Sequence, residues 1–299
     1  MKKQKWVRLS LRRLNKLLRS HGHEIAPMTV RRLLYKWKFS LRANRKRYTG
    51  PAHPDRDRQF RYIARQRKCF EQAGWPVISV DTKKKELIGN FKNAGQTWCL
   101  EAEEVNCHDF LTQGSGRASP YGLYVPARDR GFVYVGLSAD TPEFAVDAIA
   151  SWWSCSGTRC YPQAGRLLIL ADAGGSNGCR PRLWKWKLQQ FADRSGLEVT
   201  VCHYPCGASK WNPVEHRLFS YISSNWAGRP LRTLELMLGY IRGTETETGL
   251  KVTATLLPKT YRKGLKVTNQ QMKTMKWKRH TTCPAWNYTI FPRTPPPGK

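Results

Sequence analysis

Three acidic residues stand at positions where a folded chain could gather them to bind metal ions. Asp81 closes the apolar run PVISVDT, Asp172 closes the run LLILAD, and Glu215 lies in the first turn of a helix expected from Pro213. Carboxylates at one point repel each other, and Mg²⁺ (or Mn²⁺) relieves that repulsion because hard cations prefer oxygen ligands. Two such ions about 4 Å apart can activate a water or a 3′-hydroxyl for in-line attack on a phosphodiester. The residue types therefore predict metal-assisted phosphodiester chemistry.

Each acid also has an ordinary structural interpretation. Asp81 could be a turn residue after a strand, and Asp172 could orient the GGSNG turn that follows it. Glu215 lies three residues after Asn212, which is close to a capping-box arrangement. Other acids that could replace them in a catalytic set are Glu86, Glu104 and Asp109. Catalysis is favoured by the joint placement of the first three acids in an element order that would bring them together.

Strands and helices alternate around these acids. Strands are expected at 76–82, 86–91, 97–105, 131–138, 165–175 and 197–205, with a turn-rich insertion at 108–122. Helices are expected at 141–153, 180–196, 212–226 and 233–243. Three strands followed by alternating helices and strands predict an α/β fold, an RNase H-like mixed sheet with helices on both faces. In such a sheet the first and fourth strands are neighbours, so Asp81 and Asp172 would meet there and a helix could aim Glu215 at them.

A net charge of +31 predicts a polyanionic partner. The charge is concentrated at the two ends, because residues 1–50 contain 16 Lys/Arg and one acid, while residues 251–299 contain 11 Lys/Arg and none. A ribosomal-type basic protein would need neither this length nor an apolar α/β centre. No apolar run is long enough for a membrane helix and no signal region is evident. We therefore expect a cytoplasmic, nucleoid-associated protein that binds double-stranded DNA.

The basic N-terminal segment has the pattern of a helix-turn-helix. Helical spacing of leucines predicts one amphipathic helix at 8–20 and a second at 28–37, separated by a turn at Gly22. An ordinary helical hairpin is the alternative, and Ala26 is a poor N-cap for the second helix. DNA contacts are expected from Arg31, Arg32 and Lys36 on the second helix and from Arg45 and Lys46 in the arm that follows it.

Further DNA contacts are expected beside the acids. Lys83 and Lys84 follow Asp81 and could line a DNA channel or form a solvated turn. Lys210 could bind a phosphate, and Trp211 could stack on an unpaired base or pack in the core.

Several other motifs do not predict a disulfide framework, a zinc site or a nucleotide-binding site. The nine cysteines show neither a disulfide pattern nor a zinc set and are expected to be reduced and mostly buried. The DAGGSNG loop lacks the spacing of a nucleotide-binding motif. His203 and His216 do not form a metal-binding H-E-x-x-H arrangement and are expected to pack or contact DNA.

Five strings carry a specific resemblance: VISVDTKKKELIGNFKNAG, DTPEFAVDAI, LLILADAGGSNGCRPRLWKWKLQ, VCHYPCGASKWNPVEHRLFS and AWNYTIFPR. They resemble the Rhodopirellula-type DDE transposases of bacterial insertion sequences, over about residues 25–293. The resemblance implies an RNase H-like fold, Mg²⁺ dependence, and a DDE triad that falls on Asp81, Asp172 and Glu215. It also implies cleavage of an element's ends and their transfer to target DNA.

The expected organisation has four parts. Residues 1–50 form a helix-turn-helix DNA-binding segment, which is shorter than is usual in that family, and residues 51–75 form a linker helix. Residues 76–250 form the catalytic domain, and residues 251–299 form a basic C-terminal extension ending in the disordered TPPPGK.

The predicted function is a DNA transposase that acts as a homo-oligomer on terminal inverted repeats and target DNA. The alternatives are an inactive or domesticated DNA-binding remnant and another RNase H-like nuclease.

Overall fold

The computed structural model describes residues 10–41, 53–208 and 211–293. The chain divides into two compact units, Met1–Thr49 and Gly50–Lys299. The predicted DNA contacts Arg45, Lys46 and Lys210 lie outside the described residues, as does the TPPPGK tail.

The first unit is a pair of helices, α1 (Leu11–Ser20) and α2 (Pro27–Lys36), as the leucine spacing predicts. Ser10 caps α1 by accepting a hydrogen bond from the Arg13 backbone N–H at 3.3 Å. No side chain caps α2, since Ala26 occupies that position. The buried Asn15 Nδ2 donates to the Ile25 carbonyl and so links α1 to the segment entering α2.

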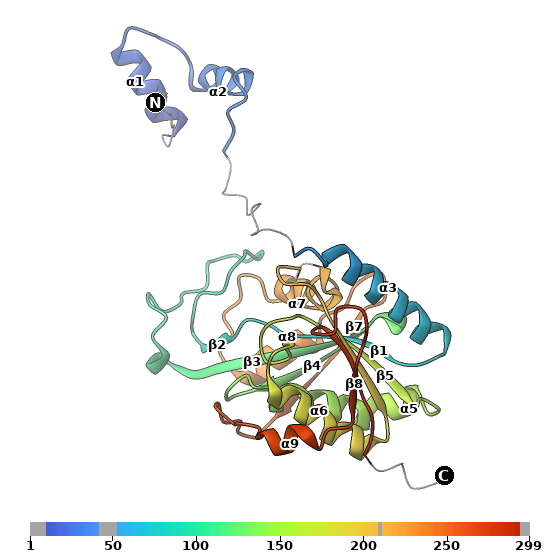
Figure 1. Cartoon of the computed structure of the whole chain (residues 1–299). Coiled ribbons are helices and arrows are strands. Elements are labelled where there is room, and N and C mark those ends of the chain that lie inside the picture. The colour runs from blue at the N-terminus through green and yellow to red at the C-terminus, as the bar shows by residue number, and fades with distance from the viewer. Residues whose placement is uncertain (1–9, 42–52, 209–210, 294–299) are drawn as a thin grey trace. The chain divides into compact units, whose positions relative to one another are not determined.

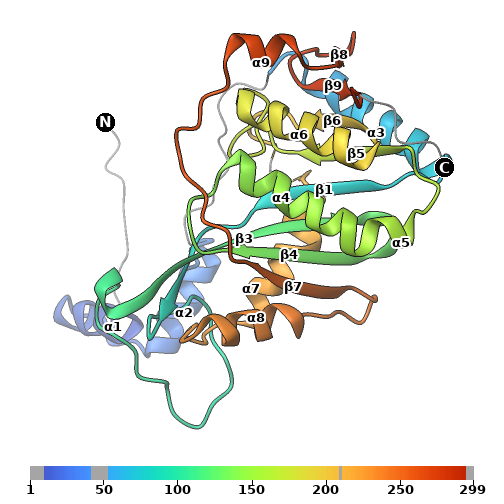
Figure 2. The same ribbon diagram turned by 90° about the horizontal axis from the view of Figure 1, so that it is seen from below.

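The second unit is built on one mixed sheet. Its strands are β1 (Val77–Thr82), β2 (Glu86–Gly89), β3 (Gly114–Val125), β4 (Arg130–Gly136), β5 (Arg166–Ala171), β6 (Glu198–His203), β7 (Lys251–Leu257), β8 (Trp277–Arg279) and β9 (Asn287–Ile290). The order across the sheet is β7-β4-β3-β1-β5-β6-β9-β8, with β2 paired to β3 alone (Figure 2). β1 runs antiparallel to β3 and parallel to β5. This is the RNase H-like order, so the predicted fold class is confirmed.

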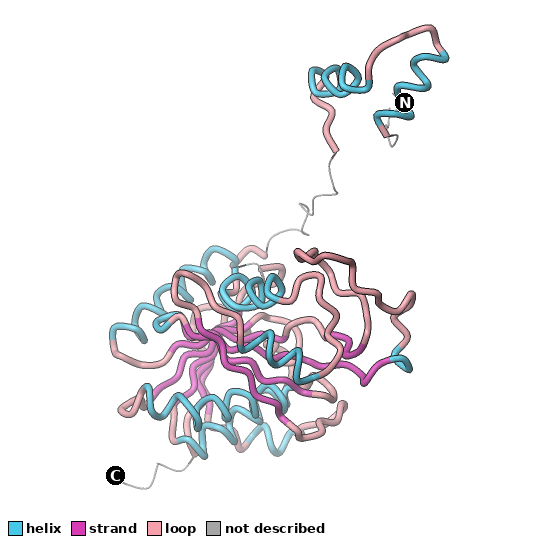
Figure 3. The backbone as a smooth tube through the Cα atoms, turned by 180° about the vertical axis from the view of Figure 1, so that it is seen from behind, coloured by secondary structure: helices cyan, strands magenta, loops and turns pink. Residues whose placement is uncertain are grey.

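Helices cover both faces of the sheet (Figures 1 and 3). The α-helices of this unit are α3 (Arg56–Gln72), α4 (Pro142–Trp152), α5 (Thr158–Cys160), α6 (Arg182–Ser195), α7 (Ser220–Asn225), α8 (Leu234–Arg242) and α9 (Asn269–Lys273). Short turns of 3-10 helix are η1 (Leu111–Gln113) and η2 (Pro126–Arg128), and π-helical turns are η3 (Trp153–Gly157) and η5 (Glu215–Phe219). Three apolar cores join the helices to the sheet. The first contains residues of α4 and α6, the second residues of α7 and α8, and the third residues of α3.

Two predicted features of the initial meander are wrong. Residues 97–105 form no strand, and most of the predicted insertion at 108–122 belongs to the long strand β3. The Gly, Ser and Pro residues of GSGRASPYG indicated turns, yet Tyr121, Leu123 and Val125 alternate into the core beneath α4. Burial of an alternating apolar face therefore outweighs weak strand propensity here.

The segments on either side of the predicted catalytic core also belong to the second unit. α3 packs Tyr62, Ile63 and Phe70 against the sheet, in a region expected to be a linker. β7, β8 and β9 pair within the sheet, so the predicted division at residue 250 runs through it. The sheet needs these strands because β7 extends it beyond β4 and β9 extends it beyond β6.

The cysteines differ from expectation in burial. All nine are free, but only Cys202 and Cys283 are buried, and five are exposed, so the prediction that most are buried is wrong. Within the described residues, no helix is long and apolar enough to cross a membrane.

A buried pair of amide side chains ties α3 to β9. Gln59 Nε2 donates to Asn287 Oδ1 and to the His203 carbonyl, both at 2.8 Å, and Asn287 Nδ2 donates back to Gln59 Oε1 at 2.6 Å. Gln59→Leu removes these bonds while keeping the side-chain volume similar. We expect the free energy of unfolding, measured by urea denaturation, to fall by about 2–3 kcal/mol because buried polar groups lose their partners. Gln72→Leu, on an exposed part of the same helix, should change it little; an equal loss in both variants would contradict this assignment.

Candidate active site

The pairing of β1 with β5 brings two of the predicted acids to one edge of the sheet. The strands are parallel, with Val80 opposite Ala171. Asp81, which is still paired with β3, and Asp172, which follows the end of β5, are the next residues along the two segments, so they lie side by side. Asp172 follows Ala171, the last residue of β5, and opens the Gly-rich loop. The Thr82 hydroxyl lies 3.2 Å from Ser176 Oγ in that loop. The neighbouring strand ends predicted from the sequence are therefore present.

Glu215 reaches the same edge because two glycines let its helix approach the sheet closely. Gly122 of β3 lies opposite Asp81, and a Cβ there would come within 2.5 Å of the Phe219 ring and 3.1 Å of Val214. A Cβ at Gly131 of β4 would come within 2.4 Å of Leu218. The missing side chains allow η5 to lie directly on β3 and β4, with Glu215 at its start.

The fully buried Asn212 connects the three parts of the site. Its Nδ2 donates to Asp172 Oδ1 at 3.0 Å and to the Val80 carbonyl at 3.3 Å. Its Oδ1 accepts from the Ser79 hydroxyl. Asn212 immediately precedes the turn that carries Glu215, so it fixes the start of that turn against β1 and β5. The sequence suggested a capping role for Asn212 but not this bridging one, because its partners lie far away along the chain.

The three carboxyl groups act on one another electrostatically. Burial, then the negative charge of Asp172, raise the pKa of Asp81 to about 8, against the lowering effect of the Thr82 backbone N–H. Burial and the charge of Asp172 raise the pKa of Glu215, and a hydrogen bond joins its carboxyl group to that of Asp81. Burial also raises the pKa of Asp172, although the bond from Asn212 lowers it. The raised pKa values mean that ionisation of all three carboxyl groups together is disfavoured, although nearby Lys83 and His216 lower the pKa of Glu215.

The chemistry of this donor set suits a divalent cation. Three carboxylates at one point supply only hard oxygen ligands, which Mg²⁺ and Mn²⁺ prefer. As it stands, no group of three His, Cys, Asp or Glu side chains among the described residues is arranged to hold a metal ion. The residues fit the ion in type, and they lie close enough for one carboxyl group to shift the pKa of another.

Asn212 is a positioning residue whose loss should slow catalysis. Asn212→Ala removes the hydrogen bond to Asp172 and the contact with Ser79, so the carboxylate loses a fixed orientation. We expect kcat for DNA cleavage to fall by about 10–100-fold, the usual cost of removing a partner that orients a metal ligand, with DNA affinity unchanged. Asn225→Ala, which removes a 2.6 Å bond to the Tyr240 carbonyl on α8, is the matched control. Equal effects of the two variants on kcat would show that Asn212 acts through stability alone.

The predicted DNA contacts of the second unit lie in different environments. Lys83 is largely buried, paired with Glu86 and 4.9 Å above the Trp226 ring. Lys84 is exposed. Trp211 is 43% exposed and packs against Phe60 and the Arg56 guanidinium. In the first unit, Arg31, Arg32 and Lys36 are exposed on α2. Lys84 and the α2 residues are therefore accessible to DNA, whereas Lys83 has a structural partner.

The alternative acids do not join the cluster. Glu86 pairs with Lys83, and Glu104 and Asp109 are exposed in the segment between β2 and β3. An acid that the sequence did not suggest, Asp140, accepts a hydrogen bond from the Thr82 hydroxyl at 3.3 Å and so lies beside β1. No sequence pattern marked Asp140, because only the sheet brings the β4–α4 connection next to Thr82.

The two histidines of interest have distinct surroundings. His203 is fully buried, with Nδ1 3.0 Å from the Asp172 carbonyl, and burial lowers its pKa to about 4. Through its contact with the Asp172 carbonyl, His203 supports the start of the Gly-rich loop. His216 is exposed next to Glu215. The packing expected of His203 is therefore present.

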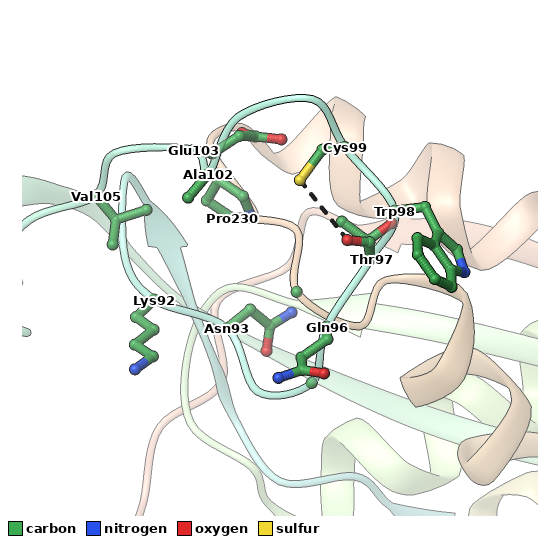
Figure 4. Close-up of a pocket in the computed structure, with 12 residues that line it drawn as sticks. Lys92, Asn93, Gln96, Thr97, Trp98, Cys99, Ala102, Glu103, Val105 and Pro230 are labelled. Carbon is green, nitrogen blue, oxygen red and sulfur yellow. Dashed lines mark hydrogen bonds between the residues drawn. The ribbon is translucent and has the colours of Figure 1, made fainter.

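A cavity of about 710 Å³ lies in the segment between β2 and β3, away from the acid cluster (Figure 4). Its described lining comes from residues 92–105 together with Gly228 and Pro230, and includes none of the three clustered acids. Glu103 at its rim pairs with Arg229 at 2.7 Å, which fixes the loop to the connection after α7. It is a loop-packing cavity separate from the acid cluster.

The sheet order and the acid cluster together define a protein of the RNase H-like class. A family model described as the Rhodopirellula transposase DDE domain matches residues 1–292. The chain therefore belongs to this family of DDE transposases, as the resemblance in its motifs predicted. No curated protein matches the chain.

Solved structures of Mos1 transposase are similar to this chain. The Mos1 strand transfer complex has a TM-score of 0.46 and 12% identity, over 81% of this chain and 71% of that chain. The paired-end complex with Mg has the same score and identity, over 79% and 71%, and the complex with Mn has a TM-score of 0.44 and 12% identity, over 79% and 70%.

Proposed function

We propose that the protein is the transposase of a bacterial insertion sequence, which cleaves the ends of its element and joins them to target DNA. The observation that carries this proposal is the convergence of Asp81, Asp172 and Glu215 at one edge of an RNase H-like sheet, in a chain of this family. The family implies a divalent metal, and these three residues are its proposed ligands. Mg²⁺ (or Mn²⁺), when bound, would supply activation of a water or 3′-hydroxyl and stabilisation of the leaving oxygen.

The chain's own residues hold this chemistry in place. Asn212 orients the Asp172 carboxylate, and η5 sets Glu215 against β1 through its contact with Gly122. The Thr82 backbone N–H donates to Asp81 Oδ1 at 2.8 Å and fixes one oxygen of that carboxylate. These fixed orientations reduce the reorganisation needed when the scissile phosphate arrives.

DNA binding is assigned to the basic parts of the chain. The exposed Arg31, Arg32 and Lys36 of α2 are proposed to contact the terminal inverted repeats, in a helix-turn-helix unit formed by residues 1–50. Arg45, Lys46, Lys84 and Lys210 are proposed to contact the DNA backbone, and Trp211 is proposed to stack on an unpaired base. Lys83, also expected to contact DNA, would do so only by giving up its ion pair with Glu86. A homo-oligomer bridging both element ends on chromosomal DNA would bring the two reactions together.

The test is cleavage in vitro by the full chain. A supercoiled plasmid carrying the inverted repeats that flank the gene is incubated with the protein and Mg²⁺. Strand breaks at the repeat ends, absent with EDTA and absent from a plasmid with scrambled repeats, are the expected result. Preferential cutting of branched DNA instead of the repeats would identify another RNase H-like nuclease, and binding to the repeats without any cleavage would identify a DNA-binding remnant.

A further inference from the structure

A cavity of about 1060 Å³ opens beside Asp172. Its walls come from the Gly-rich loop at 173–181, the first turn of α6, the turn at 205–207 and the β8–β9 hairpin. Among the described residues that line it, Asp172 is the only acid. The cavity, called the hairpin groove below, therefore begins at the proposed active site and leads away from it over the C-terminal strands.

One wall of the hairpin groove is aromatic. Trp277 of β8 and Tyr288 of β9 meet edge to face with their ring centroids 5.8 Å apart. Trp286, in the turn before β9, lies 4.7 Å from the His53 ring. Because Tyr288 is fully buried and Trp277 is partly exposed, the hairpin presents a supported aromatic surface to the groove.

The same wall carries positive charge. The Arg279 guanidinium lies 5.1 Å from the centre of the Trp277 ring, and Arg180 projects from the opposite loop. Both arginines are exposed, and neither forms an ion pair within the described part of the chain. Lys185 has a different task, since its Nζ donates to the Cys179 carbonyl and holds the loop in place. The two arginines are thus the cations available to a ligand.

The floor of the groove next to Asp172 has room for a ligand. A Cβ added at Gly174 would meet no atom within 4 Å, and Gly174 does not have a positive φ. Neither packing nor backbone strain therefore requires glycine at this position. The space above it is open to a molecule that approaches the backbone beside Asp172.

From these features we propose that the hairpin groove binds an unpaired segment of the DNA strand that enters the active site, with Arg279 and Trp277 stacking on a base and Arg180 contacting a phosphate. The inference rests on the proposed function, because it assigns the path of that function's substrate. Aromatic rings and arginines along a cationic groove are the features by which proteins bind single strands. A single strand suits this groove because its unpaired bases can turn toward the aromatic wall, whereas the bases of a duplex are already paired and stacked with one another.

The experiment compares the affinity of the full chain for two DNA probes by fluorescence anisotropy in EDTA. One probe is a duplex of the element end with a short single-stranded overhang, and the other is the same duplex with a blunt end. Wild-type protein should bind the overhang probe more tightly. Arg279→Ala should lower that preference by about tenfold, within the contribution of one stacked base, and Arg180→Ala should lower it less, because it removes only a phosphate contact.

The matched control is Lys278→Ala, which removes a positive charge from the neighbouring exposed position on β8 that does not line the groove. It should keep the wild-type preference for the overhang. Equal binding of both probes by the wild-type protein, or an equal loss in Lys278→Ala and Arg279→Ala, would overturn the inference. Binding in EDTA does not depend on turnover, so a failure here is distinguishable from a failure to cleave the inverted repeats.

Discussion

Replacing Asp172 with Ala is expected to lower the rate of Mg²⁺-dependent cleavage by about a thousandfold or more, while binding to the inverted repeats is retained. Asp172 contributes the charge that acts on both other acids of the cluster. Without it, the carboxyl groups of Asp81 and Glu215 remain, and a hydrogen bond joins them. Stabilisation by a bound ion amounts to several kcal/mol, and each 1.36 kcal/mol corresponds to a factor of ten in rate. Cleavage of labelled repeat DNA under single-turnover conditions measures the effect.

Asp109→Ala is the control for this variant. Asp109 is an exposed acid that the sequence left as an alternative, and it lies outside the cluster. Its removal should leave cleavage within a few-fold of the wild-type rate, and gel-shift assays should give the same repeat affinity for both variants. Full cleavage by Asp172→Ala would remove this residue from the catalytic set. Loss of repeat binding in Asp172→Ala would show that the change acts on folding or DNA grip.

Gly122→Val is expected to remove most cleavage activity although Gly122 carries no side chain. Valine favours strands, so the local backbone tolerates it. Its Cβ, however, would come within 2.5 Å of the buried Phe219 ring, and its two methyl groups extend further. Such overpacking costs about 1–3 kcal/mol and pushes η5, with Glu215, away from Asp81. A displacement of about 1 Å can cost a hundredfold in rate.

Two measurements separate these effects. Thermal unfolding should show a Tm lower by several degrees, since each kcal/mol corresponds to about 2–4 °C for a domain of this size. Cleavage should be measured well below that Tm, where the protein is still folded. Gly239→Ala in α8 is the control, because a Cβ there meets nothing within 4 Å and alanine favours helix. That variant should be at least as stable as wild type and equally active, and a wild-type cleavage rate in Gly122→Val would contradict the proposed role of the close approach.

The first and fourth long strands of this fold could be predicted because their sequences are locally unambiguous. PVISVDT and LLILAD are short apolar runs, each ended by an acid, and parallel pairing of β1 with β5 follows from the order of elements. The helices α4, α6 and α8 could be predicted equally well, because threonine caps or apolar periodicity mark most of their ends. Local pattern and fold order therefore suffice for Asp81 and Asp172.

The strand β3 could not be predicted in this way. Its Gly-rich start and Pro120 indicate turns, and only pairing with β1 and β4 on both sides makes the segment a central strand. The same pairing explains why position 122 is a glycine. A side chain opposite Asp81 would clash only because η5 packs against β3 at that point. This part of the site is determined by burial against residues distant in sequence, which local sequence patterns do not reveal.

By itself, the sequence determined which acids could form the catalytic set, the class of fold that would hold them and the basic character of the partner. These follow from residue types, apolar periodicity and charge, which are properties of single segments. Only the tertiary structure decided how the set is held: Asn212 bridges Asp172 and Ser79, and β8 and β9 bring Arg279 and Trp277 to the groove beside Asp172. The two hydrogen bonds of Asn212 join residues 40 and 133 positions apart, and their geometry exists only when the strands have paired.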